Sequence, residues 1–246
     1  MSTPQPNGMN PSLLVDKDGI GWITFDDPGR KVNVLTEGVM TCFSELLGNV
    51  RNLVNEGRLH ALVLRSGKGG FIAGADIAAI EAVLDPIEGA EASRSGQAIF
   101  GLLSTLGVPS IAAIHGICLG GGAEMALACS HRVASDSPRT QMGFPEVLLG
   151  ILPAWGGTSR LPRLVGLGGS LDMLLTGRRV SASKARRMGL VDEIFPADLF
   201  REKVAVFAME RARSKAPPSG RRLPFLKGVM DRTRFGRKIV LSASRR

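Results

Sequence analysis

The sequence predicts an α/β fold, in which short strands alternate with helices along most of the chain. Residues 59–64 and 110–114 are uninterrupted runs of small, apolar or β-branched residues, as expected for parallel strands buried on both faces. Between such runs lie segments whose apolar residues recur at helical spacing. The helices crowd together in the last third of the chain, so the alternation is irregular.

The first expected elements are a β-hairpin and a helix. Residues 12–16 and 20–25 are β-rich runs around the turn signal at 17–19 (KDG). Thr36 is placed to cap a helix. The apolar residues expected to face the core from this helix are Val39, Phe43, Leu46, Leu47 and Val50.

The later elements follow from the same criteria. A glycine-rich loop at 66–76 ends at Asp76, which is expected to cap the next helix. Residues 140–147 are expected to form a loop and 152–158 a turn. We expect helices at 77–84, 93–106, 124–129, 158–164, 170–175, 183–188 and 199–213, and strands at 110–114, 131–135 and 191–195.

Composition bounds the class of protein. The chain has 246 residues, 44% of them apolar, and no stretch nears the roughly 18 apolar residues that cross a membrane. Its start has neither the apolar run of a secretory signal nor the arginines of a transit peptide. Three cysteines, Cys42, Cys118 and Cys129, without metal-type spacing predict free buried thiols in a reducing compartment. We expect a bacterial cytoplasmic protein, with the mitochondrial matrix less favoured.

The basic charge is concentrated near the C-terminus. Residues 201–246 hold 14 Lys and Arg against 3 Asp and Glu, whereas the first 200 residues hold 17 against 19. A basic tail can bind nucleic acid, an anionic membrane or a phosphorylated ligand, or it can be a solvated linker. The tail has only Phe225 and Phe235 for stacking on bases, so nucleic-acid binding is the disfavoured alternative.

Two glycine-rich loops accompany two acidic residues. The loops are residues 73–76 (AGAD) and 120–122 (GGG), and the acids are Glu124 and Glu146. Backbone N–H groups from two loops can hold one oxygen in an oxyanion hole, helped by the positive end of a helix. Two carboxylates at one site push their pKa values apart, so that one acts as an acid and the other as a base. The set suits enolate chemistry beside a polarised carbonyl.

A structural interpretation competes with this one, because glycine loops are often turns and Glu124 could be only a charge at a helix start. Other chemistries are less consistent with the sequence. The triple glycine lacks the Lys-Ser/Thr of a nucleoside-triphosphate loop and the spacing of a dinucleotide fold. There is no Gly-x-Ser-x-Gly elbow, and three scattered histidines suggest no metal centre.

Ordered motifs resemble those of the enoyl-CoA hydratase (crotonase) superfamily. The likeness runs from about residue 12 to residue 216, and its details are similar to the N-terminal hydratase region of multifunctional fatty-acid-oxidation α-subunits. The motifs are residues 71–77 (FIAGADI), 115–124 (HGICLGGGAE), 144–153 (FPEVLLGILP), 156–162 (GGTSRLP), 175–185 (LTGRRVSASKA) and 188–193 (MGLVDE).

The resemblance implies a crotonase fold, a spiral of ββα units followed by a helical C-terminal region, and an acyl-CoA thioester substrate. It implies reversible hydration of trans-2-enoyl-CoA to 3-hydroxyacyl-CoA in β-oxidation. In that reaction Glu124 would activate water and Glu146 would protonate C2. The backbone N–H groups of Ala75 and Gly121 would hold the thioester oxygen. No metal or separate cofactor is implied, since coenzyme A is part of the substrate.

Further positions match substrate contacts or depart from the pattern. Ala73 matches a position near the adenine of coenzyme A, and Asp76 and Gly120 lie in the same two loops. Trp155 replaces a small residue, and it either lines the acyl pocket or only packs. Ala78 stands where relatives often have a Lys or Arg for a coenzyme A phosphate. The enzyme alternative is a Δ3,Δ2-enoyl-CoA isomerase or another crotonase chemistry.

The expected organisation is a flexible tail at 1–11, a spiral core at 12–196, and a helical region with a basic, linker-like tail at 197–246. Residues 221–235 resemble the linker that precedes a dehydrogenase domain. The resemblance therefore implies two kinds of assembly. One is a homo-oligomer, and the other is a longer parent with a fused 3-hydroxyacyl-CoA dehydrogenase domain and a thiolase subunit.

Overall fold

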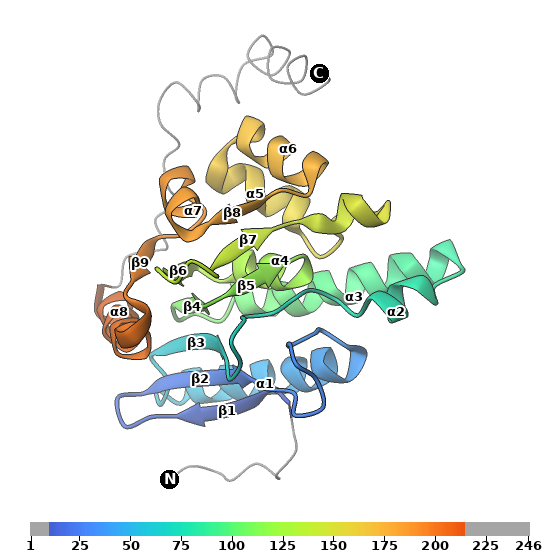
Figure 1. Ribbon diagram of the computed structural model, residues 1–246. Helices are drawn as coiled ribbons and strands as arrows, with labels where there is room; N and C mark the ends of the chain where they lie inside the picture. The colour runs from blue at the N-terminus through green and yellow to red at the C-terminus, as the bar shows by residue number, and fades with distance from the viewer. Residues whose placement is uncertain (1–9, 215–246) are drawn as a thin grey trace.

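A six-stranded sheet forms the centre of the molecule in the computed structural model, which describes residues 10–214 (Figure 1). The expected basic tail from residue 215 onward, and nearly all of the expected N-terminal tail, lie outside these residues. The first pair of strands is antiparallel and the others are parallel. In spatial order the strands are β1 (Ser12–Val15), β2 (Ile20–Phe25), β3 (Ala61–Ser66), β4 (Ser110–Ile114), β6 (His131–Ser135) and β9 (Glu193–Phe195).

A smaller sheet and the helices surround this centre. The smaller sheet has the order β5 (Ile117–Leu119), β7 (Gln141–Gly143) and β8 (Arg179–Ser181). Two short 3-10 helices are η1 (Pro145–Leu149) and η2 (Ala197–Leu199). The α-helices are α1 (Glu37–Asn55), α2 (Ile77–Glu81), α3 (Pro86–Ser104), α4 (Gly121–Ala128), α5 (Gly157–Val165), α6 (Leu167–Thr176), α7 (Ala182–Met188) and α8 (Phe200–Ser214).

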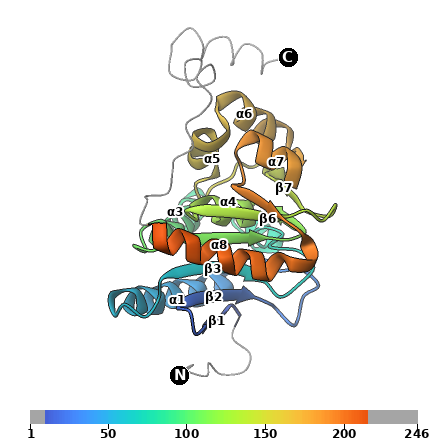
Figure 2. The same cartoon turned by 90° about the vertical axis from the view of Figure 1, so that its left-hand side faces the viewer.

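Side chains alternate between the two faces of the main sheet. In β3, Ala61 and Val63 belong to the cluster that contacts α8, while Leu62 and Leu64 belong to the cluster on the other face. Helix α8 lies across the first face (Figure 2). Its Phe207 is buried in the cluster on that face. Because both faces are covered, the strands read as continuous apolar runs rather than alternating ones.

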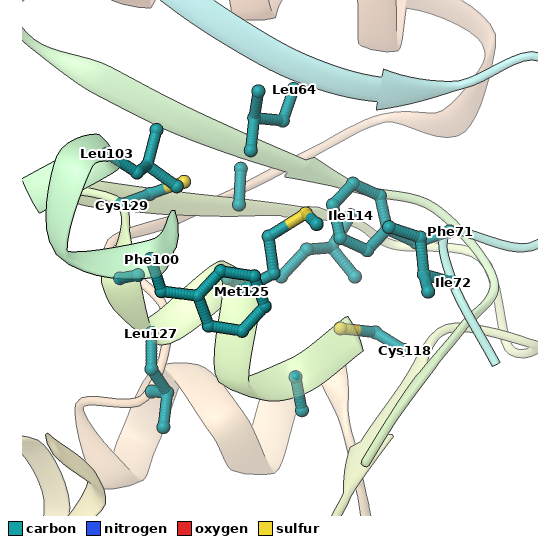
Figure 3. Close-up of a cluster of buried hydrophobic side chains, with 14 of the residues drawn as sticks. Leu64, Phe71, Ile72, Phe100, Leu103, Ile114, Cys118, Met125, Leu127 and Cys129 are labelled. Atoms are coloured by element: carbon teal, nitrogen blue, oxygen red, sulfur yellow. The ribbon is translucent and has the colours of Figure 1, made fainter. Parts of the chain in front are cut away.

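The second face carries the larger core. Figure 3 shows Phe100 and Leu103 of α3 together with Met125 and Leu127 of α4 and Leu64 of the main sheet. All eight residues of α4 are buried. The buried guanidinium of Arg132 donates to the carbonyl oxygen of Cys129, just past the end of α4, at 2.8 Å. Helix α4 is therefore packed on every side.

The loop after β3 runs beside β5. The amide of Phe71 donates to the carbonyl of Ile117 at 2.9 Å, and the amide of Leu119 donates to the carbonyl of Ile72 at 3.0 Å. Gly116, with φ of 65°, precedes β5, and a side chain there would collide with the carbonyl oxygen of Gly69. This contact places the loop directly beside the start of α4.

Asn33 fixes the same loop from its other side. Its buried side-chain amide donates to the carbonyls of Phe25 and Phe71, at 2.8 and 3.2 Å, and to the hydroxyl of Ser66 at 2.8 Å. The backbone carbonyl of Asn33 accepts from the amide of Ala73 at 2.9 Å. Asn33 thus ties the end of β2 to the loop that follows β3.

Much of the expected element order is confirmed. The hairpin forms, Thr36 caps α1 by accepting from the amide of Val39, and Asp76 caps α2 by accepting from that of Ala78. The strands at 110–114 and 131–135 have the expected bounds. The three cysteines are free thiols, although Cys42 is only partly buried.

Other expectations are wrong in detail. Residues 140–147 are not a loop, because they contain β7 and the start of η1. Strands β5 and β8 are additional to the expected ones; each has three residues and pairs with β7, from a distant part of the chain. Helix α4 starts three residues before Glu124, because Gly121 and Gly122 adopt helical conformations. Helix α2 ends at Glu81, and α3 begins as early as Pro86.

None of the helices between residues 10 and 214 is both long and apolar enough to cross a membrane.

We predict that replacing Asn33 with Ala destabilises the protein. The change removes the side-chain donor of the buried carbonyl of Phe71, while the carbonyl of Phe25 keeps the amide of Gly67 at 2.9 Å. One unsatisfied buried carbonyl should lower the free energy of unfolding by about 1–3 kcal/mol. Urea unfolding followed by circular dichroism measures this. Ser66→Ala is the control, because it removes one partner of Asn33 and keeps both carbonyls satisfied. Equal stability of Asn33→Ala and the parent would contradict the role given to this amide.

Candidate active site

A cavity of about 470 Å³ lies at the N-terminus of α4. Its walls come from the loop at 73–75, helices α2 and α3, the start of η1, and the turn at 151–155. Most of its lining is apolar, which suits a hydrocarbon chain. The lining residues are Ala73, Gly74, Ala75, Ile77, Ile80, Val83, Gly89, Ala92, Ser93, Gly120, Gly121, Glu124, Pro145, Glu146, Leu149, Ile151, Leu152, Ala154 and Trp155.

The three glycines before Glu124 each have a separate steric reason. Gly120 is the N-cap of α4 and has φ of 51°, in the region that favours glycine. A Cβ on Gly121 would lie 2.7 Å from Cζ3 of Trp155. A Cβ on Gly122 would lie 2.6 Å from the carbonyl oxygen of Ile72. Because Gly121 and Gly122 have no side chains, the start of α4 lies closer to the loop and to the indole than other residues at these positions would allow.

This approach brings together two backbone amides. A Cβ on Gly121 would lie 3.5 Å from the amide nitrogen of Ala75, so the two residues border the same small space. The first amides of a helix have no partner within it, and Gly121 is the first residue of α4. Among the loop and turn hydrogen bonds of residues 10–214, none uses the amide of Ala75 or of Gly121. Both are available to bind an oxygen atom from two sides.

Glu124 stands in the first turn of α4 and is only 2% exposed. Its Oε1 accepts from the amides of Trp155 and Gly157, at 2.8 and 2.7 Å. Burial raises the pKa of Glu124 to about 7, while the hydrogen bond from Gly157 opposes the shift and the charge of Glu146 adds to it. A carboxyl group with this pKa can both accept and return a proton near neutral pH.

Glu146 reaches the same cavity from the first turn of η1. Its Oε1 lies close to Gly120, 3.1 Å from the position of a Cβ there. Its Oε2 is buried without a hydrogen-bond partner among the described residues. Burial also raises the pKa of Glu146. A buried carboxylate oxygen with no partner is costly in an ordinary core and is typical of a reactive site.

Trp155 lines the cavity and also packs against the hydrophobic core. The sequence offered these two roles as alternatives, and the residue has both. Its ring meets Phe100 edge-on, with centroids 5.7 Å apart. Arg160 donates from Nη1 to the carbonyl of Trp155 at 2.9 Å, and its guanidinium fills the space beside Gly156, where a side chain would collide with it. The turn is thus held by Arg160 on one side and by Glu124 on the other.

The structure brings together most of the residues singled out in the sequence. Seven of them line the cavity: Ala73, Ala75, Gly120, Gly121, Glu124, Glu146 and Trp155. Asp76 is the exception, since it caps α2 with Oδ1 and pairs with Arg30 through Oδ2 at 2.9 Å. Its carboxylate secures the loop and is not part of the cavity wall.

Sequence reasoning missed the apolar wall contributed by α2 and α3. Small residues recur along α3 at helical spacing, at Gly89, Ala92, Ser93 and Gly96, and the first three line the cavity. That spacing was a usable signal for a groove. Asn33 and Arg160 left no comparable signal, because their partners are distant backbone atoms. No group of three or more His, Cys, Asp or Glu within residues 10–214 is arranged to hold a metal ion.

Comparison with known proteins shows the family to which the chain belongs. Residues 16–233 match the model of the family described as Enoyl-CoA hydratase/isomerase. The fatty acid oxidation complex subunit alpha of Idiomarina loihiensis is 42% identical over 234 residues, which cover 93% of this chain and 32% of that protein. The corresponding subunit of Shewanella baltica is 40% identical over 224 residues, 91% of this chain and 31% of that protein. The chain spans about a third of the length of these curated relatives.

Solved structures show the same fold. An enoyl-CoA hydratase from Bacillus anthracis superposes with a TM-score of 0.76 at 28% identity, covering 95% of this chain and 90% of that one. DspI of Pseudomonas aeruginosa has a TM-score of 0.74 at 31% identity, covering 87% of this chain and 79% of that one. With a family model that covers most of its length, the chain belongs to the enoyl-CoA hydratase/isomerase family and has the α/β crotonase fold.

Proposed function

We propose that this protein catalyses the reversible hydration of trans-2-enoyl-CoA thioesters to 3-hydroxyacyl-CoA in fatty-acid oxidation. The observation that carries the proposal is the meeting of two carboxyl groups and two free backbone amides at one apolar cavity. A Δ3,Δ2-isomerase needs to move only one proton between two carbons, for which a single base suffices. The presence of Glu124 and Glu146 together favours hydration.

In the proposed reaction the thioester oxygen accepts hydrogen bonds from the amides of Ala75 and Gly121. Glu124 takes a proton from water while the water oxygen attacks C3. The double-bond electrons move toward C1, and the thioester oxygen gains the negative charge of an enolate. The two amides and the positive end of α4 stabilise that charge. Glu146 then gives its proton to C2.

The proton balance closes within the pair. After one turnover Glu124 carries the proton taken from water and Glu146 is ionised. Transfer of that proton from Glu124 to Glu146 restores the starting state. Burial raises the pKa of both groups, and the charge of Glu146 raises that of Glu124 further, so that one carboxyl group of the pair can hold a proton while the other is ionised.

The roles of the remaining contacts are part of the proposal. Ala73, whose amide is tied to Asn33, would border the adenine of coenzyme A, and the apolar walls would bind the acyl chain. Because the relatives are about three times longer, we propose that a longer parent of this chain would join the hydratase to further subunits or domains of such a complex.

We predict that Glu124→Gln and Glu146→Gln each lower kcat for crotonyl-CoA hydration by about 10²–10⁴-fold, the usual contribution of a general acid or base. The glutamine at 124 keeps an oxygen for the amides of Trp155 and Gly157, so the fold should persist. The loss of absorbance at the conjugated thioester measures the rate. Glu81→Gln, an exposed residue of α2, is the matched control.

Isomerisation of a 3-enoyl-CoA separates the two candidate activities. If hydration is the main reaction, the parent hydrates crotonyl-CoA faster than it isomerises 3-hexenoyl-CoA. Glu124→Gln should then keep more of its isomerase than of its hydratase rate, because Glu146 remains as a single base. Parent-like hydration by either glutamine variant would refute the mechanism.

The raised pKa of Glu124 also predicts how stability depends on pH. Between pH 4.5 and about 7 the folded protein binds this proton and the unfolded chain does not, so the free energy of unfolding falls as pH rises through this range. The contribution is up to about 3 kcal/mol. Glu124→Gln should lose that part of the decrease between pH 5 and pH 8, whereas Glu81→Gln should keep it. Urea unfolding at pH 5 and at pH 8 measures the free energy of unfolding. An equal decrease between the two pH values in the parent, Glu124→Gln and Glu81→Gln would contradict the raised pKa of Glu124.

A further inference from the structure

The indole of Trp155 occupies a space that two glycines leave open. On one side, a Cβ on Gly121 would lie 2.7 and 2.9 Å from Cζ3 and Cε3 of the six-membered ring. On the other side, a Cβ on Gly96 of α3 would collide with Cδ1 and Nε1 of the five-membered ring. The ring is therefore clamped between α4 and α3, and only the absence of both side chains lets it lie there.

This position sets the ring beside the place where the thioester would bind. The point that is 2.7 Å from Cζ3 is also 3.5 Å from the amide nitrogen of Ala75. The six-membered ring edge thus borders the space between the two free amides, and the ring also lines the cavity. A thioester whose carbonyl oxygen accepts from those amides would have the first carbons of its acyl chain next to the ring.

The ring has little freedom to move away. Its other neighbour is Phe100, which meets it edge-on in the fully buried core of α3 and α4. The backbone of Trp155 is fixed through its amide to Glu124 and through its carbonyl to Arg160. Close-packed interiors resist such displacements, so a substrate must fit the ring as it stands.

We propose that Trp155 is a specificity-determining residue that excludes acyl groups with a substituent on C2 or C3. Its ring occupies the space that the missing side chain of Gly96 leaves open. This inference rests on the proposed function, because it assumes that the two amides hold a thioester. The site accepts flat, unbranched enoyl groups beside the indole edge, and the chain beyond C3 extends along the small residues of α3.

The test compares branched with linear substrates in Trp155→Ala and Trp155→Phe. The ratio of kcat/KM for 2-methylcrotonyl-CoA or 3-methylcrotonyl-CoA to that for crotonyl-CoA should rise about tenfold or more in Trp155→Ala, as expected when a pocket gains room for one methyl group. Trp155→Phe should give a smaller rise. Trp22→Phe, which changes the other tryptophan on the opposite face of the sheet, should leave both ratios unchanged.

Gly96→Ala provides a test from outside the cavity. The added methyl group should press the indole toward the substrate, so both ratios should fall by about threefold or more. The effect should vanish in the double variant Gly96→Ala/Trp155→Ala, because no ring remains to be pushed, and such non-additivity identifies a direct contact. Additive effects would show that Gly96 does not act through Trp155 and would overturn the proposal.

Binding measurements keep the inference separate from the proposed reaction. Calorimetric titration of butyryl-CoA and 2-methylbutyryl-CoA reports the same selectivity without turnover, and circular dichroism shows that each variant is folded. If the parent does not hydrate crotonyl-CoA but binds butyryl-CoA selectively, the proposed function fails and the inference stands. If the parent hydrates crotonyl-CoA and no folded variant changes the ratios or relative affinities, the inference is wrong. Should Trp155→Ala not fold, Trp155→Phe and Gly96→Ala decide the question.

Discussion

The close approach of the first turn of α4 to the loop after β3 is the constraint on which the site depends. Gly122 lies against the carbonyl of Ile72, and Gly121 faces both the amide of Ala75 and the ring of Trp155. One methyl group at either glycine would need the space that the neighbouring backbone or ring occupies. Backbone amides gain their catalytic value from being held in place beforehand, so this packing determines whether two of them can act on one oxygen.

Contacts around α4 and around the loop after β3 hold the two close together. Arg132 binds the carbonyl of Cys129 at the far end of the helix, and the core of α3 covers its side. Asn33 holds the loop from β2, and the loop pairs with β5 through Ile72 and Cys118. Four separate parts of the chain must therefore fold together before the two amides come into position.

The same packing explains why the pKa values of Glu124 and Glu146 are raised. Glu124 is buried, which disfavours its charge, yet two amides from the turn at 155–157 point at one of its oxygens. The balance leaves its pKa near 7 instead of far above or below that value. Glu146 lacks such donors at Oε2, so its carboxyl group is left to interact with whatever enters the cavity. The two acids face one space in different environments, as acid–base chemistry requires.

Several features could be predicted from local sequence because local physics controls them. The capping residues Thr36 and Asp76, the hairpin around Asp18-Gly19 and the buried strand at 110–114 each depend on a few adjacent residues. The glycine loops and Glu124 were recognisable for the same reason. Strands β5 and β8 were missed because three residues carry too weak a signal, and their pairing with β7 depends on the tertiary structure.

The sequence by itself determined the α/β class, most of the long elements and the identity of the two acids, since these follow from periodicity, caps and motifs. Only the tertiary structure decided that Asp76 secures the loop while Trp155 faces the cavity, and that Asn33 and Arg160 hold the site together. Those assignments depend on contacts between residues far apart in the chain, such as Gly96 with Trp155 and Glu124 with Gly157. Their distances are set by how whole helices and loops pack, which neighbouring residues in the sequence do not encode.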